Sequence, residues 1–220
     1  MTTLTNEPTM KIRALERTDL KNIHIINNKA ETMRLWFEEP YESLDELTSL
    51  YDKHIHDNTE RRFVIEANDT FIGIVELMSI DYIHRTCEIQ IIIISGFSGK
   101  GYAQKALKTG VDYAFNTLNM HKVYLWVDID NAPAVHIYKK LGFKIEGTIK
   151  EQFFAGGKYH DSYFMGILKS EYAQKEKMIK KKKQEKFLFF YFLAFFLTFF
   201  HFLLSTFHGL FHSKLSCFTF

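Results

Sequence analysis

The sequence predicts an α/β (α+β) domain, in which a mixed central sheet of six to seven strands is flanked by helices. Three observations lead to this fold class. Apolar runs with strand character occur early and late in the chain, helical periodicities lie between them, and a glycine-rich turn joins a buried strand to a helix near the middle. At 220 residues, the chain is long enough for one full-sized domain with an appendage.

The N-terminal part predicts a strand and two helices. Residues Met10–Leu15 alternate like a half-buried strand, and Asp19–Asn28 carries apolar residues at helical spacing. Another helix should begin at Ser43, because Ser43 and Glu46 have the spacing of a capping box. The apolar residues behind this cap should form its buried face, and they are Leu44, Leu47, Leu50 and Tyr51.

The remaining elements follow from apolar runs separated by turn residues. Three strands rich in Ile, Val and Phe predict an antiparallel meander: Arg62–Glu66, Phe71–Ile80 and Thr86–Ile94. After Gly96 and Gly99, the pattern predicts a helix from about Tyr102 to Asn116 and then a strand over His121–Val127. Another helix should run from Asn131 to about Lys140 and end at Gly142. A closing hairpin should pair Phe143–Ile149 with Tyr159–Leu168.

Charge is distributed unevenly along the chain. The stretch from Glu31 to Glu60 has nine acidic residues against two basic ones. Residues 1–177 carry a net charge of −3 and residues 178–220 carry +5. A mildly acidic main domain argues against nucleic acid as a partner, and a strongly acidic segment favours a multiply charged cation.

Cysteine and histidine usage excludes several kinds of site. Cys87 and Cys217 form no disulfide framework and have no metal-ligand spacing. His54 and His56, two residues apart, splay on a helix, which is poor geometry for one metal ion, so we expect no metal there. The first ten residues lack an apolar signal-peptide core, and we therefore expect a cytoplasmic protein.

Two motifs carry the chemical prediction. In Ser98–Ala103, glycines would let backbone amides approach a phosphate, and the following helix would present its positive end to the same anion. In Asn131–Phe143, an amphipathic helix carries Tyr138 and ends at a glycine before a strand. Taken alone, the loop also fits a plain strand-to-helix turn, and Tyr138 also fits an ordinary core residue.

Together, these motifs resemble the GCN5-related N-acetyltransferase (GNAT) superfamily. From Lys11 to Tyr172, the chain further resembles the bacterial spermidine N-acetyltransferases of that superfamily. The segments that carry this resemblance are Trp36–Glu42, Lys53–Asp57, Glu60–Val64, Gln90–Ile93 and Glu151–Phe154.

The resemblance implies an enzyme that acetylates a primary amine of spermidine or spermine by direct attack on acetyl-CoA, without a required metal. It implies that Tyr138 is the general acid for the CoA thiolate. It places acetyl-CoA against Ile91, Ile92, Ile93, Ser98, Gly99, Lys100, Gly101, Tyr102, Ala103, Gln104, Asn131, Ala132, Pro133, Ala134, Val135, His136, Ile137, Tyr138 and Lys140. Direct attack needs no acyl-enzyme, so Cys87 need not be a nucleophile.

The resemblance also implies polyamine-dependent allosteric control in a homo-oligomer, a dodecamer, with part of the polyamine site between subunits. It assigns polyamine binding to Glu38, Glu46, His54, Ile55, His56, Asp57, Glu60, Glu88, Ile89 and Gln90. Two positions depart from the family pattern. Ser98 replaces a Gln or Arg that is common in the phosphate loop, so we expect a lower affinity for CoA than in relatives. Ser79 stands where relatives often carry an acid, so we expect one polyamine or cation ligand to be missing and the allosteric response to be affected.

The last residues differ in composition from the rest. We expect a catalytic domain over residues 1–175 and a basic, then Phe-rich, tail over 176–220. Phe187–Leu204 is 18 residues without a charge, about 27 Å long as a helix. Three interpretations stay open: a non-native extension from read-through of an A/T-rich stretch, a C-terminal membrane anchor behind Lys180–Lys183, or a buried helix.

Two other functions also remain open at the level of sequence. One is N-acetylation of another amine, either a protein N-terminus or an aminoglycoside, which the acidic segment would also suit. The other is a polyamine-binding sensor with weak or lost turnover. The presence of Tyr138, Gly99 and Gly101 favours the enzyme over the sensor.

Overall fold

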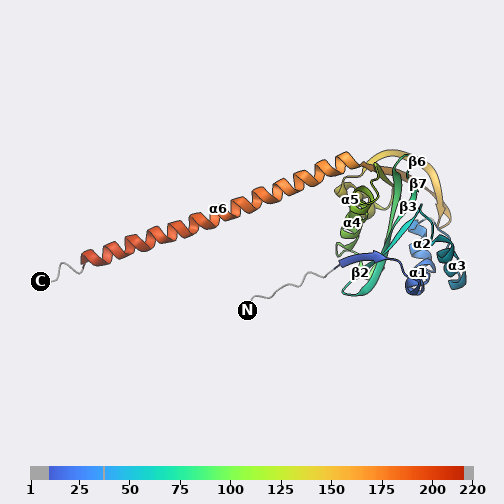
Figure 1. Cartoon of the computed structure of the whole chain (residues 1–220), viewed down its shortest axis with the longest axis horizontal. Coiled ribbons are helices and arrows are strands. Elements are labelled where there is room, and N and C mark those ends of the chain that lie inside the picture. Colours follow the sequence, from blue (N-terminus) through green and yellow to red (C-terminus); the bar gives the residue numbers. More distant parts are fainter. Residues whose placement is uncertain (1–9, 37, 216–220) are drawn as a thin grey trace. The chain divides into compact units, whose positions relative to one another are not determined.

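The structure is a computed structural model that describes residues 10–36 and 38–215, with side chains described up to residue 198. Its elements are labelled in Figure 1. The strands are β1 Met10–Ala14, β2 Arg61–Ala67, β3 Thr70–Asp81, β4 Thr86–Ile93, β5 Lys122–Asp128, β6 Lys144–Ala155 and β7 Lys158–Leu168. The helices are α1 Leu20–Asn27, α2 Ala30–Trp36, α3 Leu44–His54, α4 Tyr102–Asn116, α5 Ala132–Leu141 and α6 Lys169–Leu215, with short 3-10 turns at Arg17–Asp19 and Ser95–Phe97.

Within the described residues, seven strands form one mixed sheet in the order β1-β2-β3-β4-β5-β7-β6. All neighbouring pairs are antiparallel except β4 and β5, which run parallel. The predicted mixed sheet with flanking helices is therefore confirmed. The meander prediction is also confirmed, because β2, β3 and β4 pair consecutively and antiparallel.

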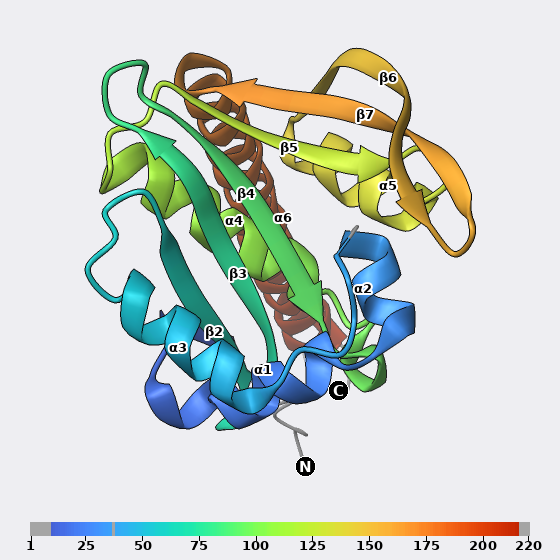
Figure 2. The same cartoon turned by 90° about the vertical axis from the view of Figure 1, so that its right-hand side faces the viewer.

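Helices cover both faces of this sheet, and each face has its own apolar core. Figure 2 shows α4 behind the sheet and α1 to α3 in front of it. The larger core packs residues such as Val75, Ile89 and Leu125 together with Leu107 and Val111 of α4. The smaller core joins α1 and α3 to Ile74 and Ile92 on the opposite face. Side chains that alternate along β3 and β4 thus serve two different layers.

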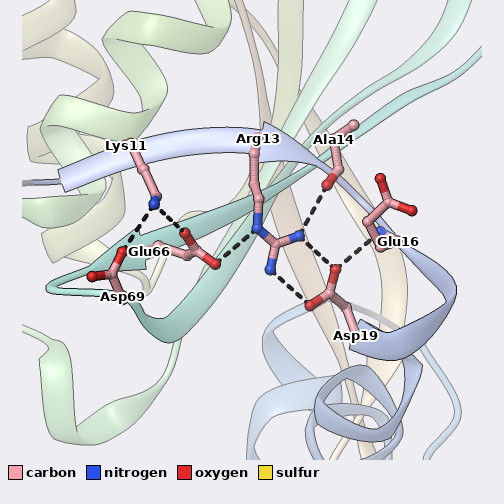
Figure 3. A network of polar contacts seen from close by, with 7 residues as sticks. All are labelled: Lys11, Arg13, Ala14, Glu16, Asp19, Glu66 and Asp69. Atoms are coloured by element: carbon pink, nitrogen blue, oxygen red, sulfur yellow. Dashed lines mark hydrogen bonds and ion pairs between the residues drawn. The ribbon is translucent and has the colours of Figure 1, made fainter.

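A network of charged side chains attaches β1 to β2 and to the start of α1 (Figure 3). Arg13 donates two hydrogen bonds to the Asp19 carboxylate, at 2.7 and 2.9 Å, and a third to Glu66, at 2.8 Å. Lys11 adds ion pairs to Glu66 and Asp69. The guanidinium of Arg13 holds the pKa of Asp19 and of Glu66 below their usual range. We call these five residues the β1 network.

Three expectations from the sequence need correction. Helix α2 was not predicted, because its seven residues are too few to show a helical period. Strand β6 continues to Ala155 instead of ending at Ile149, across an irregularity in its pairing with β7 between Ile149 and Phe153. On α3, Leu47 is buried, but Leu44 and Leu50 are each 37% exposed, since this short helix packs through a narrow stripe.

The chain divides into two compact units between Tyr172 and Ala173, within α6. The first unit contains the sheet and α1 to α5. The predicted apolar segment, 187–204, falls in the second unit, and its residues beyond 198 lie outside those with described side chains. In the portion of the chain that the structure describes, no helix combines the length and apolarity needed to cross a membrane.

Candidate active site

The parallel strands β4 and β5 pair over only a short distance. Their register covers Thr86 with Lys122, Cys87 with Val123 and Glu88 with Tyr124. Beyond Glu88 the strands separate, and Figure 2 shows them running side by side at their starts and apart at their ends. Among the described residues, no strand therefore pairs with the β5-facing edge of β4 from Ile89 onward. Such an edge can hydrogen-bond an extended ligand as an added strand would.

Helix α2 reaches this opening. The indole Nε1 of Trp36 donates a hydrogen bond to the carbonyl of Ile91, at 3.2 Å. Ile91 belongs to the predicted acetyl-CoA set, and its side chain packs against the larger core together with that of Ile93. Ile92 points into the smaller core. The backbone of this strand, not its side chains, therefore faces the separation between β4 and β5.

The glycine-rich loop after β4 leads directly into α4. Gly99 and Gly101 both have left-handed backbone angles, with φ of +76° and +80°. Gly101 is the N-cap of α4 and provides no capping side chain, so the first-turn amides of Tyr102, Ala103 and Gln104 remain available to an anion. Lys100 contacts the Gly96 carbonyl at 3.1 Å. This geometry fits a phosphate or pyrophosphate group.

Helix α5 packs on α4 and carries Tyr138. Its N-cap is Asn131, whose side chain accepts a hydrogen bond from the amide of Ala134, and Pro133 lies in the first turn. Tyr138 is only 9% exposed, and its ring lies 6.1 Å from that of Phe143. Burial raises the pKa of the Tyr138 phenol to about 12. The phenol therefore keeps its proton at neutral pH and can act as an acid.

The remaining predicted acetyl-CoA residues take different positions. Tyr102 and Val135 are buried in the larger core, so their side chains support α4 and α5. His136 and Lys140 are exposed on α5. Ala132, Ala134 and Ile137 complete that helix, and Ser98 precedes the two left-handed glycines. The loop leads into the first turn of α4, and α5 packs against the same helix.

The face of the sheet that packs against α1 and α3 carries a row of polar side chains. Arg62, Glu76 and Gln90 are direct partners across β2, β3 and β4. Glu88 lies on the same face, and Tyr124 is its partner on β5. Gln90 donates a hydrogen bond to Glu88 at 2.9 Å. Charged and polar residues therefore extend from β2 to the point where β4 and β5 separate.

Arg62 forms ion pairs with two carboxylates, Glu60 and Glu76. We call these three residues and His54 the Arg62 cluster. Arg62 contacts Glu60 at 2.9 Å, and His54 lies 3.2 Å from the same carboxylate. Arg62 Nε lies 3.5 Å from Glu76, which is an ion pair without hydrogen-bond geometry. One guanidinium thus serves two carboxylates in this cluster.

Burial controls the protonation of the carboxyls on this face. It raises the pKa of the Glu76 carboxyl above its ordinary value; the Arg62 guanidinium opposes this shift, and the carboxylates of Glu60 and Glu38 add to it. Burial also raises the pKa of Glu88, and the hydrogen bond from Gln90 opposes that shift. Both groups would gain from a cation placed between them.

The other predicted polyamine residues are more dispersed. Glu38 and Glu46 are exposed, as are Ile55 and His56 after α3. Asp57 accepts hydrogen bonds from the amide and hydroxyl of Thr59, so its carboxylate is engaged in its own turn. Ile89 points into the larger core, away from Glu88 and Gln90. Of the predicted set, His54, Glu60, Glu88 and Gln90 lie along the polar row, and the exposed Glu38 carboxylate is near enough to Glu76 to raise its pKa.

Sequence reasoning missed three residues of this row, namely Arg62, Glu76 and Tyr124. The signal was present for Glu76, which is a charged residue in the middle of an otherwise apolar strand. Cys87, in contrast, behaves as expected for a residue without a nucleophilic role. It is fully buried, and burial raises the pKa of its thiol to about 12.

Comparison with known proteins identifies the fold and the family. Residues 9–144 match the model of the acetyltransferase (GNAT) domain. The chain belongs to the GNAT acetyltransferase family. Among curated GNAT proteins, it is 52% identical over 167 residues to the spermidine N(1)-acetyltransferase of Vibrio cholerae, covering 76% of this chain and 96% of that protein. It is 49% identical over 168 residues to the enzyme of the same name from Escherichia coli K12, covering 76% and 90%.

Solved structures of GNAT proteins give the same result. The Vibrio cholerae spermidine N-acetyltransferase in complex with CoA and spermine superposes with a TM-score of 0.73 at 52% identity, covering 74% of this chain and 98% of that one. A dodecameric structure of the same enzyme superposes with a TM-score of 0.67 at 50% identity, covering 74% and 95%. The resemblance stated from the sequence motifs is thereby confirmed, as is the GNAT fold.

Proposed function

We propose that this GNAT protein transfers the acetyl group of acetyl-CoA to a primary amine of spermidine or spermine. The observation that carries the proposal is the polar row from Arg62 to Tyr124, which ends where β4 and β5 separate. It offers carboxylates to a polycation beside an unpaired strand edge for the acyl donor. Relatives of about 50% identity that are named as spermidine N-acetyltransferases support the same substrate class.

The acyl donor would lie along the unpaired edge of β4. Backbone groups of Ile91 to Ile93 would hydrogen-bond the pantetheine and polarise the thioester carbonyl. The amides after Gly101 would hold the pyrophosphate at the positive end of α4. Residues Asn131 to Lys140 of α5 would line the other side of the CoA. The absence of a capping side chain at Gly101 supports this placement.

The amine must lose a proton before it can attack, because an ammonium has no lone pair. Glu76 and Glu60 would hold the charged nitrogens of the polyamine near the sheet. Glu88 would accept the proton of the reacting nitrogen, since burial raises the pKa of this carboxyl and makes it a stronger base. Attack on the thioester carbonyl then gives a tetrahedral intermediate without any acyl-enzyme.

Collapse of that intermediate releases the CoA thiolate. Tyr138 would protonate it, because a phenol with a pKa of about 12 is fully protonated at neutral pH. The pathway requires no metal. The buried Cys87 has no part in it, consistent with a thiol whose pKa is raised to about 12.

We further propose that the protein works in the cytoplasm as a homo-oligomer, a dodecamer like its Vibrio cholerae relative. The exposed acids Glu38 and Glu46 would then contribute to a second, allosteric polyamine site between subunits. Apolar side chains left exposed on α2 and α3, including Leu35 and Leu44, support such an interface.

A thiol-release assay tests the proposed reaction. Purified protein with acetyl-CoA should release CoA with spermidine or spermine, and far less with tobramycin or a peptide N-terminus. Tyr138→Phe should lower kcat by about 100-fold or more. Tyr159→Phe, which removes the hydroxyl of an exposed tyrosine, is the matched control and should retain full activity.

The outcomes separate the alternatives. Turnover with tobramycin but not with spermidine would overturn the substrate class. Calorimetric binding of spermidine without any CoA release would identify a sensor instead of an enzyme. Unchanged turnover in Tyr138→Phe would remove Tyr138 as the acid while leaving the substrate assignment intact.

A further inference from the structure

A second polar cluster lies at the far end of β5, outside all residues assigned above. Asp128 is the last residue of β5 and stands directly opposite Ser162 on β7. His160, two residues before Ser162, points to the same face. One imidazole nitrogen of His160 and one carboxylate oxygen each of Asp128 and Asp130 lie within 4.8 Å of one another. We propose that Asp128, Asp130 and His160 bind one divalent transition-metal ion.

The histidine is arranged as metal-ligating histidines are. His160 is 5% exposed, and its Nε2 lies 3.1 Å from the carbonyl of Ala155. A carbonyl can only accept, so Nε2 carries a proton, and Nδ1 faces the carboxylates. Nδ1 is 2.8 Å from the Asp128 carboxylate. A backbone carbonyl that holds the second ring nitrogen is the usual partner behind a histidine ligand, because it sets the tautomer and the ring orientation.

Ser162 provides an independent indication that this cluster is incomplete by itself. It is fully buried, and among the described residues its hydroxyl has no hydrogen-bond partner. A buried hydroxyl without a partner is costly, and native structures rarely leave one. As the cross-strand neighbour of Asp128, Ser162 lies beside the cluster. A bound ion, or a water on that ion, would supply the missing partner.

The donor set selects the class of ion. One imidazole and two carboxylates suit Zn²⁺, Mn²⁺ or Co²⁺, whereas Ca²⁺ and Mg²⁺ prefer all-oxygen sites. Asp130 is exposed and gives the ion a path from solvent.

The ion would act on the fold and not on the reacting atoms. Asp128 Oδ1 accepts a hydrogen bond from the amide of Asp130, and Asn131 follows as the N-cap of α5. Metal binding would thus join β7, the end of β5 and the turn into the helix that carries Tyr138. This positioning role is separate from the proposed acetyl transfer, and it stands even if the substrate assignment fails.

Isothermal titration calorimetry of the full chain with ZnCl₂ or MnCl₂ tests the site. We expect one site with a Kd near or below about 10 μM, weakened at least tenfold in His160→Gln and in Asp130→Asn. His84→Gln, which changes an exposed histidine elsewhere, is the matched control and should bind as wild type does. MgCl₂ at the same concentration should give no heat.

The chain also carries His201, His208 and His212, so the difference between wild type and His160→Gln is the readout rather than total stoichiometry. Asp130 is exposed, and its replacement by Asn carries little risk to folding. Identical binding by wild type, His160→Gln and Asp130→Asn, or no binding by wild type, would overturn the proposal.

Discussion

The β1 network and the Arg62 cluster use the same residue types to opposite effect. In the β1 network, Arg13 donates hydrogen bonds to both Asp19 and Glu66, and the pKa values of both carboxyls fall. In the Arg62 cluster, the guanidinium forms an ion pair with Glu76 without hydrogen-bond geometry, and the pKa of Glu76 rises because burial outweighs this ion pair. In the first group the carboxylates accept short hydrogen bonds from Lys11 and Arg13, and in the second the ion pair between Arg62 and Glu76 lacks hydrogen-bond geometry.

This difference separates structural charges from functional ones. A satisfied network contributes to folding and has little reason to bind anything else. A buried carboxylate whose ion pair lacks a hydrogen bond lowers the stability of the fold, and an added cation would stabilise it most. The polar row extends from this cluster to the opening between β4 and β5, where a polyamine would enter. Four experiments test this difference between the two regions.

Replacing Arg13 should have the largest effect. Arg13→Met leaves Asp19 and Glu66 without their main partner and should lower the free energy of unfolding by about 2–3 kcal/mol, below the full value for a buried pair because Arg13 is partly exposed. Urea denaturation measures this. Lys11→Met is the control, since that exposed lysine should contribute much less. Equal losses in the two variants would contradict the contrast.

Neutralising Glu76 should affect binding more than stability. Glu76→Gln should raise the KM for spermidine about tenfold, equivalent to about 1.4 kcal/mol, while the free energy of unfolding changes by less than about 1 kcal/mol. Glu66→Gln should do the reverse, with a loss of stability and an unchanged KM. If both variants altered KM equally, the two groups of charges would not differ in function.

The two regions should also give stability opposite dependences on pH. Asp19 and Glu66 have lowered pKa values in the folded state, so their contribution is present above their ordinary values of 3.8 and 4.5 and is lost as pH falls. Glu76 has a raised pKa, so stability declines as pH rises from 4.5 through that raised value. The urea midpoint should be measured between pH 3 and pH 8. Asp19→Asn should make the midpoint less dependent on pH on the acid side, and Glu76→Gln should do so above pH 4.5.

Salt should produce the smallest effect. Raising NaCl from 20 to 500 mM should increase the KM for spermidine about threefold, because counter-ions screen the attraction between the carboxylates and the polyamine. The increase should be smaller in Glu76→Gln. The urea midpoint of wild type should hardly move, since the Arg13 contacts are short and partly buried. A KM independent of salt would argue against electrostatic recognition.

Local patterns in the sequence predicted most of the fold. Helix α4 was predicted with its observed bounds, and the three strands of the meander were placed to within one or two residues, because helical and strand periods repeat within a few residues. The turn into α4 followed from its glycines. Helix α2 and the end of β6 were missed, since a seven-residue helix and a polar, irregular edge strand lack such periods.

Local patterns therefore sufficed to predict the order of the elements, the acidic character of residues 31–60 and the motifs that identify the family. Which charged side chains contact one another became visible in the folded chain. Arg62 and Glu76 become partners through the register of β2 and β3, and Asp128 and His160 through that of β5 and β7. Strand register depends on how the whole sheet packs between its two helical layers, so no local pattern specifies these pairs.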